Sequence, residues 1–251
     1  MRKSGSRLAI ALVLLGCASL ASAQTADQVI ERCLTAVGGR AALLKLKSRS
    51  TVGTITLSTP MGDIEGSVEL LNAAPNKSRS LIKADLTALG AGQLVLDQRF
   101  DGTSGYAMDS LQGNRDITGT QLENMRNGSF PHPFLTYKDM GVSAQLRGKE
   151  KVGDRDAFVL VLEPTSGSAV RQYIDAETYL PMKVAVTVDV PQLGTTIEQT
   201  TELSDYRSVD GVKLPFKLHA SSSIQSYTIV VSKIEHNVPI DDALFSKPAR
   251  Q

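Results

Sequence analysis

The sequence predicts a mainly β domain with a few helices, in which an antiparallel meander closes or half closes into a barrel. Two observations support this fold class. Short runs of strand character recur through most of the chain and are separated by Gly, Pro, Asn or Asp. Helical periodicity is confined to an N-terminal and a central segment, so strands do not alternate with helices as they do in parallel α/β folds.

The first 23 residues have the form of a secretory signal peptide. Arg2, Lys3 and Arg7 precede an uncharged apolar stretch, and Ala21-Ser22-Ala23 is a cleavage site of the A-x-A type. The stretch is much shorter than the roughly 20 apolar residues of a membrane-spanning helix. Cleavage after Ala23 would release residues 24–251 as a single periplasmic domain.

A second processing signal overlaps the first. Leu14-Leu15-Gly16-Cys17 resembles a bacterial lipobox, and a lipid attached to Cys17 would make the protein an outer-membrane lipoprotein. The A-x-A site is clean, whereas a bulky Leu before the Gly–Cys pair is not the commonest lipobox form. The sequence therefore favours the released form, with the lipid-anchored form as the alternative.

The charge distribution argues against one class of function, and the cysteine content leaves one thiol to explain. The chain has 27 Lys and Arg against 26 Asp and Glu, and removing three basic residues with the signal leaves 24 against 26. Charges of both signs are scattered, which argues against nucleic-acid binding. After cleavage Cys33 is the remaining cysteine, and its helical spacing with Val29, Ile30 and Val37 predicts a core residue.

The elements follow in order from local patterns. Residues 25–46 are predicted to be helical, with Thr25 or Asp27 as a cap and a break at Gly38-Gly39. Alternating runs at 51–58 and 64–71, joined by a turn, predict a hairpin. Residues 101–109 are predicted to form a turn. Further strands are predicted at 78–85, 92–100, 157–164, 171–176, 182–190, 196–207, 215–223 and 227–236.

Residues 118–140 interrupt the strand pattern. Leu122 and Met125 predict one short helix, and Phe130 and Phe134 lie in an irregular apolar loop around two prolines. Such a segment can cover an apolar surface as a lid that lifts for a ligand or as a permanent plug. The sequence leaves both interpretations open.

Two strands carry the apolar faces that such a segment would cover. Val186 and Val188 share an apolar face opposite a polar one, whereas the strand with Phe158 and Leu160 is apolar on both faces and must be covered on both. A helix of the same chain or a ligand can provide the cover. The predicted cavity or lid residues are therefore Leu122, Met125, Phe130, Phe134, Phe158, Leu160, Val186 and Val188.

The sequence lacks motifs for catalysis, metal binding or cofactor binding. His132, His219 and His236 are far apart and have no metal-ligand spacing, and no phosphate- or dinucleotide-binding motif is present. Neighbouring carboxylates such as Asp241 and Asp242 are better explained as capping or solvated groups. We expect no catalytic residue, no metal and no cofactor, and hence a protein that is not an enzyme.

Four stretches resemble a known family. They are GSVELLNAAPNKSR (66–79), LVLDQRFDGTSGYAMD (94–109), LSDYRSVDGVKLPFKL (203–218) and IEHNVPIDDALFSKP (234–248). Together they resemble the LolA/LolB-like superfamily of outer-membrane lipoprotein-sorting proteins, over residues 26–248. The resemblance implies an incomplete antiparallel β-barrel wrapped around N-terminal and central helices, with an apolar cavity for acyl chains.

The resemblance also sets the functional expectation. It implies a non-enzymatic periplasmic carrier or chaperone, monomeric, which binds lipid acyl chains or a lipidated protein and contacts membranes transiently or through Cys17. The alternative is a periplasmic interaction module that binds a membrane or envelope protein and has no ligand of its own. Ala74 precedes Pro75 where the lipoprotein carrier has an arginine linked to its lid, so that carrier's release mechanism does not transfer to this chain.

Overall fold

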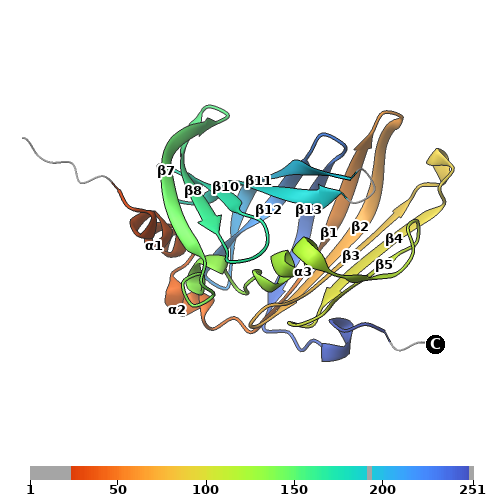
Figure 1. Ribbon diagram of the computed structural model, residues 1–251, viewed down its shortest axis with the longest axis horizontal. Helices are drawn as coiled ribbons and strands as arrows, with labels where there is room; N and C mark the ends of the chain where they lie inside the picture. Colours follow the sequence, from red (N-terminus) through yellow and green to blue (C-terminus); the bar gives the residue numbers. More distant parts are fainter. Residues whose placement is uncertain (1–23, 191–193, 249–251) are drawn as a thin grey trace, which may run out of the picture.

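The computed structural model describes residues 24–190 and 194–248. The predicted signal peptide and Cys17 lie outside the described residues. The described residues form one antiparallel sheet of 13 strands, in the order β6-β5-β4-β3-β2-β1-β13-β12-β11-β10-β9-β8-β7. Figure 1 shows this sheet bent around an open side, across which α3 lies. The prediction of a mainly β fold built from an antiparallel meander is confirmed.

The elements have the following bounds. The helices are α1 (Ala26–Ala36), α2 (Arg40–Leu43) and α3 (Gly119–Arg126), and short 3-10 turns include η2 (Pro133–Leu135) and η4 (Asp242–Leu244). The strands before α3 are β1 (Ser48–Thr59), β2 (Gly62–Ala73), β3 (Lys77–Asp85), β4 (Gln93–Phe100), β5 (Gly105–Asp109) and β6 (Arg115–Ile117). The strands after α3 are β7 (Ser143–Val152), β8 (Arg155–Glu163), β9 (Val170–Asp175), β10 (Pro181–Val190), β11 (Thr195–Val209), β12 (Val212–Ser221) and β13 (Ser226–His236).

The two halves of the sheet are joined by its first and last strands. β1 pairs with β13 in antiparallel register, with Ile55 opposite Ile229. As a result β6 and β7, which are consecutive in the chain, form opposite edges of the sheet. The connection between them, which contains α3 and η2, therefore has to cross the open side.

The N-terminal helix begins and ends as the sequence predicts. Thr25 and Gln28 form a capping box at the start of α1, and Val29, Ile30, Cys33 and Leu34 are its buried residues. Gly38 has a φ of +132°, and a Cβ there would lie 2.5 Å from the Gly211 carbonyl oxygen. The break before α2 therefore needs glycine both for its backbone conformation and for the close approach of β12.

Two faces of the sheet can be distinguished from the strand register. The inner face is the one on which α1 packs against Phe158 and Leu160, and on which Met125 of α3 approaches Gly105. The outer face carries Ala157 and Val159, which are also buried. The prediction that β8 is covered on both faces is thus confirmed, and Cys33 is a core residue as predicted, with burial raising the pKa of its thiol to about 12.

The C-terminal segment covers part of the outer face. Phe245, next to η4, is 1% exposed, and the Ser246 carbonyl oxygen accepts a hydrogen bond from Arg99 at 3.2 Å. The carboxylate of Asp97, which is 2% exposed, binds this Arg99 and also Arg79, with shortest N–O distances of 2.8 and 2.7 Å. The segment thus shields a charged network on β3 and β4.

The sequence analysis was wrong about residues 101–109 and did not predict β7. A turn occupies residues 101–104, but Gly105–Asp109 forms strand β5, which pairs with β4 and β6. β7 is an edge strand whose residues are mostly exposed and charged or polar, so it lacks the apolar alternation that identifies a strand. Charged edges of this kind protect a sheet from pairing with other chains.

Candidate functional site

The centre of the inner face is a cluster of apolar side chains that we call the inner patch. Its buried members are Ile55, Val68, Phe216, Ile229 and Val231, and its half-buried members are Leu57, Leu70, Ile82, Val209, Leu218, Tyr227 and Ile234. All of them come from β1–β3 and β11–β13, and within the described residues no helix contributes to the cluster. Helices therefore cover the β7–β9 end of the inner face, while the inner patch is formed by strands alone.

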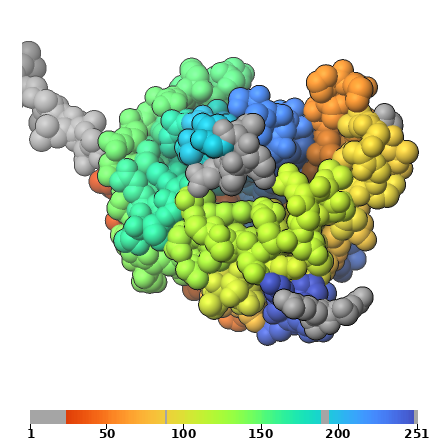
Figure 2. All heavy atoms as spheres, turned by 45° about the vertical axis from the view of Figure 1, so that its right-hand side comes forward, coloured from red at the N-terminus to blue at the C-terminus, as the bar shows by residue number. Residues whose placement is uncertain are grey.

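Helix α3 links two hairpin turns that are far apart in the sheet. On one side Asn124 bonds Ser168 in the β8–β9 turn, accepting from its backbone N–H at 2.7 Å and donating to its hydroxyl at 3.1 Å. On the other side Arg126 donates to the Thr103 carbonyl oxygen in the β4–β5 turn at 3.1 Å. In Figure 2 this yellow-green part of the chain crosses the open side of the sheet. We call residues 119–127 the α3 strap.

The strap is held mainly by polar groups. Glu123 accepts from the Ser166 hydroxyl at 2.7 Å, and Asn127 donates to the Ser166 carbonyl oxygen at 2.7 Å. None of the residues of α3 is fully buried. Hydrogen bonds of this kind each contribute only about 0.5–1.5 kcal/mol, so the attachment of the strap depends on polar contacts rather than on a buried apolar core.

The loop after the strap is anchored differently. Phe134 is 0% exposed and packs in the same core as α1, and the Tyr137 hydroxyl donates to Asp27 of α1 at 2.6 Å. The Phe130 N–H donates to the Pro75 carbonyl oxygen at 2.9 Å. The central segment therefore consists of a lightly held strap followed by a deeply packed loop.

The eight predicted ligand-binding residues lie in two environments. Four are buried in the core that contains α1, namely Phe130, Phe134, Phe158 and Leu160. The other four are half-buried, on the strap or on β10, namely Leu122, Met125, Val186 and Val188. The inner patch on β12 and β13 was not predicted from the sequence, because nothing local shows that β13 pairs with β1 and so brings these strands beside the first half of the sheet.

Gly167 lies in close contact with the strap where the strap docks on the β8–β9 turn. Gly167 has a φ of +91°, and a Cβ there would lie 2.7 Å from Asn124 Oδ1 and 2.8 Å from Asn127 Nδ2. We expect Gly167→Ala to lower stability by about 1–3 kcal/mol through backbone strain and this clash, and to speed amide hydrogen exchange across α3. Gly153→Ala is the matched control, since Gly153 also has a positive φ but has no atom within 4 Å of its Cβ position. Equal exchange rates in α3 for the two variants would contradict the docking role.

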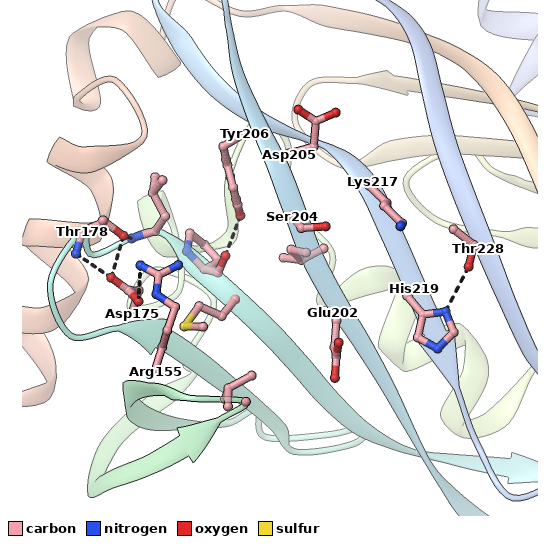
Figure 3. Close-up of a pocket in the computed structure, with 16 residues that line it drawn as sticks. Arg155, Asp175, Thr178, Glu202, Ser204, Asp205, Tyr206, Lys217, His219 and Thr228 are labelled. Carbon is pink, nitrogen blue, oxygen red and sulfur yellow. Dashed lines mark hydrogen bonds and ion pairs between the residues drawn. The ribbon is translucent and has the colours of Figure 1, made fainter.

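A groove of about 680 Å³ lies on the outer face across β8–β13 (Figure 3). Its lining residues are Val152, Gly153, Arg155, Asp175, Thr178, Leu180, Pro181, Met182, Glu202, Leu203, Ser204, Asp205, Tyr206, Lys217, His219 and Thr228. The labelled polar side chains in Figure 3 come from several neighbouring strands. We call this feature the outer groove.

The polar groups of the outer groove bond mainly to structural partners. Asp175 accepts from the Thr178 N–H at 2.6 Å and pairs with Arg155 at 2.6 Å; burial raises the pKa of Asp175, but these partners outweigh it and hold the pKa below 3.8. His219 Nδ1 lies 3.0 Å from the Thr228 hydroxyl oxygen. Among the described residues no hydrogen bond joins His219 to Ser204, so the groove does not present a paired nucleophile and base.

Within residues 24–190 and 194–248, no three His, Cys, Asp or Glu side chains are grouped so that they could hold a metal ion. Among the same residues no helix has the length and apolar character needed to cross a membrane.

The comparisons with known proteins begin with a family model. A model described as "Uncharacterized protein" matches residues 111–249, which is more than half of the 251-residue chain. A search of curated proteins found no match.

Solved structures with the same fold come from several bacteria. A LolA superfamily protein from Nitrosomonas europaea has 15% identity and a TM-score of 0.56, covering 90% of this chain and 99% of its own. A DUF1329 family protein from Desulfovibrio piger has 13% identity and a TM-score of 0.56, covering 88% and 97%. A putative outer membrane lipoprotein-sorting protein domain from Vibrio parahaemolyticus has 14% identity and a TM-score of 0.54, covering 87% and 97%. At these identities the likeness establishes a shared fold.

Proposed function

The chain belongs to the family whose model matches residues 111–249 and has the fold of LolA superfamily proteins, and on this premise we propose that it is a non-enzymatic carrier in the bacterial periplasm. Its ligand is a lipid, or the acyl chains of a lipidated protein, bound on the inner face of the sheet. In this proposal the sheet and its helices enclose the ligand as an incomplete barrel, and the protein acts as a monomer that contacts membranes transiently.

The observation that carries the proposal is the inner patch beneath the α3 strap. Half-buried apolar side chains such as Leu57, Leu218 and Tyr227 line it without a helix packed on them. Removing apolar surface from water contributes about 25 cal/mol per Å², so an acyl chain laid on this patch would bind without any specific polar contact. Because hydrogen bonds hold the strap to the sheet, its displacement would let a ligand reach the inner patch.

The predicted site residues take different parts in this proposal. Val186 and Val188 extend the inner patch along β10, and Leu122 and Met125 cover the bound chain from the strap. Phe158, Leu160 and Phe134 close the β7–β9 end of the cavity as a fixed wall, because they pack with α1. Phe130 belongs to the same core but lies beside Pro75 and Arg49.

A charge placed on the inner patch tests the function. We expect Leu218→Glu to weaken binding of a fluorescent fatty acid at least tenfold, since a carboxylate there would be desolvated and unpaired. Val230→Glu is the control, because Val230 is 46% exposed, on the outer face, and paired with Lys217. Circular dichroism would verify that both variants fold. Equal affinity in the two variants, or no uptake by the wild-type protein, would count against a carrier.

The outer groove favours a second candidate function, an interaction module for an envelope protein. Arg155, Glu202 and Lys217 give the groove charges of both signs, which suit the polar rim of a protein interface. In that case Lys217→Glu should abolish capture of one stoichiometric envelope protein, while Leu218→Glu should leave it intact. The opposite pattern would support the carrier.

A further inference from the structure

The inner face changes character along the strands. In β1 to β4 most inner-face residues at one end are polar, and they are Arg49, Thr51, Asn72, Ser78, Ser80 and Gln98, with Leu70 and Phe100 as the apolar residues among them. Towards the other end of the same strands they are apolar, and they are Ile55, Leu57, Ile64, Val68, Ile82, Leu94 and Leu96. The polar groups of this face are therefore concentrated at the Arg49 end, and the other end is apolar.

Arg49 is the cation at the polar end, and no carboxylate within the described residues forms an ion pair with it. Its polar contact is with Asn72 Oδ1 at 3.5 Å, and its guanidinium carbon lies 5.4 Å from the centre of the Phe130 ring. Burial lowers the pKa of Arg49 to about 10, so the group stays charged at neutral pH. The half-buried arginines Arg79 and Arg99 both bind Asp97, and the half-buried Arg171 pairs with Glu198.

A second buried group beside Arg49 has one nitrogen without a hydrogen-bond partner. His236 lies directly opposite Arg49 in the register of β1 and β13, and its side chain is 1% exposed. Its Nδ1–H donates to Asp210 at 3.0 Å, but Nε2 is buried and has no hydrogen-bond partner. Buried polar atoms are nearly always bonded to protein, water or ligand, so the free Nε2 indicates that something else binds here.

The remaining groups around this end do not neutralise the charge. Asp210 is 66% exposed and is bound to His236. His132 accepts from the Phe134 N–H through Nδ1, and burial together with the nearby Arg49 charge lowers its pKa to about 4, so it is neutral at pH 7. Asp205 is paired with Arg207. Both neighbouring carboxylates already have partners, so neither is free to pair with Arg49 in place of an anionic ligand.

We propose that the carried ligand is an amphiphile with one anionic head group, which Arg49 binds beside His236 while the chain lies along the inner patch. This rests on the proposed carrier function and names its ligand class. Arg49 offers the planar donor set that suits a carboxylate or a phosphate, and His236 lies directly opposite it in the register of β1 and β13. Arg49 to Leu57 spans about 27 Å at about 3.4 Å per residue, which is longer than an acyl chain that fills half of a hydrocarbon core of about 30 Å.

Three probes of equal chain length test the proposal, each displacing an uncharged fluorescent alkane from the full mature chain. We expect hexadecanoate and hexadecyl phosphate to bind at least tenfold more tightly than hexadecanol. In Arg49→Gln this preference should fall below about threefold, with hexadecanol affinity unchanged, and Arg49→Lys should retain part of it. Lys83→Gln removes a charge from an exposed outer-face position and should keep the full preference.

The outcomes separate the two proposals. If hexadecanol binds as well as the anions in the wild-type protein, or if Arg49→Gln keeps the preference, the anionic head group is wrong while the carrier function stands. If neither the fluorescent alkane nor any of the three probes binds, both are wrong. A preference for one of the two anions identifies the head group as carboxylate or phosphate. If Arg49→Gln does not fold, the anion preference of Arg49→Lys is compared with that of Lys83→Gln instead. A smaller preference in Arg49→Lys supports the proposal, and an equal preference contradicts it.

Discussion

Replacing Asp97 by Asn is expected to lower the free energy of unfolding by about 3–5 kcal/mol, as when one partner of a buried ion pair is removed. Asp97 is 2% exposed and binds Arg79 and Arg99, whose side chains are 12% and 11% exposed. Asparagine has a similar shape but carries no charge, so both guanidinium groups would remain buried without a counterion. Urea unfolding at pH 7 measures the effect. Asp116→Asn is the control, because the pair of Asp116 with Lys247 is exposed and such pairs contribute at most about 1 kcal/mol.

The same carboxylate gives the stability a defined pH dependence. Burial raises the pKa of Asp97, but the hydrogen bonds and charges of Arg79 and Arg99 outweigh it and lower the pKa below 3.8. A carboxylate with a depressed folded-state pKa stabilises the fold above its unfolded pKa of about 3.9, and this contribution is lost as the pH falls towards the folded value. The difference between wild type and Asp97→Asn should therefore be full at pH 6 and shrink below about pH 4. A difference that is constant with pH would rule out the charge as its origin.

Local sequence patterns predicted most elements because their causes are local. Thr25 caps α1, Gly38 ends the helical segment, and the turn at residues 60–63 joins two strands whose alternation is clear. Strands β5 and β7 escaped prediction for the opposite reason. β7 is an exposed and charged edge strand, and β5 is a strand of five residues that begins at a glycine, so composition alone does not distinguish them from turns.

The candidate site was harder to predict because it depends on long-range pairing. Phe158 and Val186 could be identified from alternation within one strand. The inner patch, in contrast, arises because β1 pairs with β13, which places Ile55 beside Ile229 although the two are far apart in the sequence.

Arg49 illustrates what a closer sequence analysis could detect. Arg49 alternates in step with Thr51, Ile55 and Leu57 on β1, so it is a charged residue at a position that faces inward. A charge at an inward position marks a candidate site from sequence alone. That it lacks a counterion, and that His236 lies opposite, depends on tertiary structure.

Replacing Phe134 by Ala distinguishes a plug from a lid in the central segment. Phe134 is 0% exposed and packs in the core that contains α1, Phe158 and Leu160. We expect the variant to lower the free energy of unfolding by about 3–5 kcal/mol, the usual cost of deleting a buried phenyl ring. Urea unfolding measures it, with Leu122→Ala on the half-buried strap as the control at about 1 kcal/mol.

The result assigns a role to each part of the segment. A large loss for Phe134→Ala with unchanged exchange in α3 would mean that the loop is part of the permanent core and that the strap alone opens. Because the loop is tied to α1 through Tyr137 and Asp27 as well as through Phe134, lifting it would disrupt the core around α1, whereas lifting the strap breaks hydrogen bonds that water can replace. A loss below about 1 kcal/mol would show instead that the loop around Phe134 leaves the core readily, and the lid would then extend over the whole central segment.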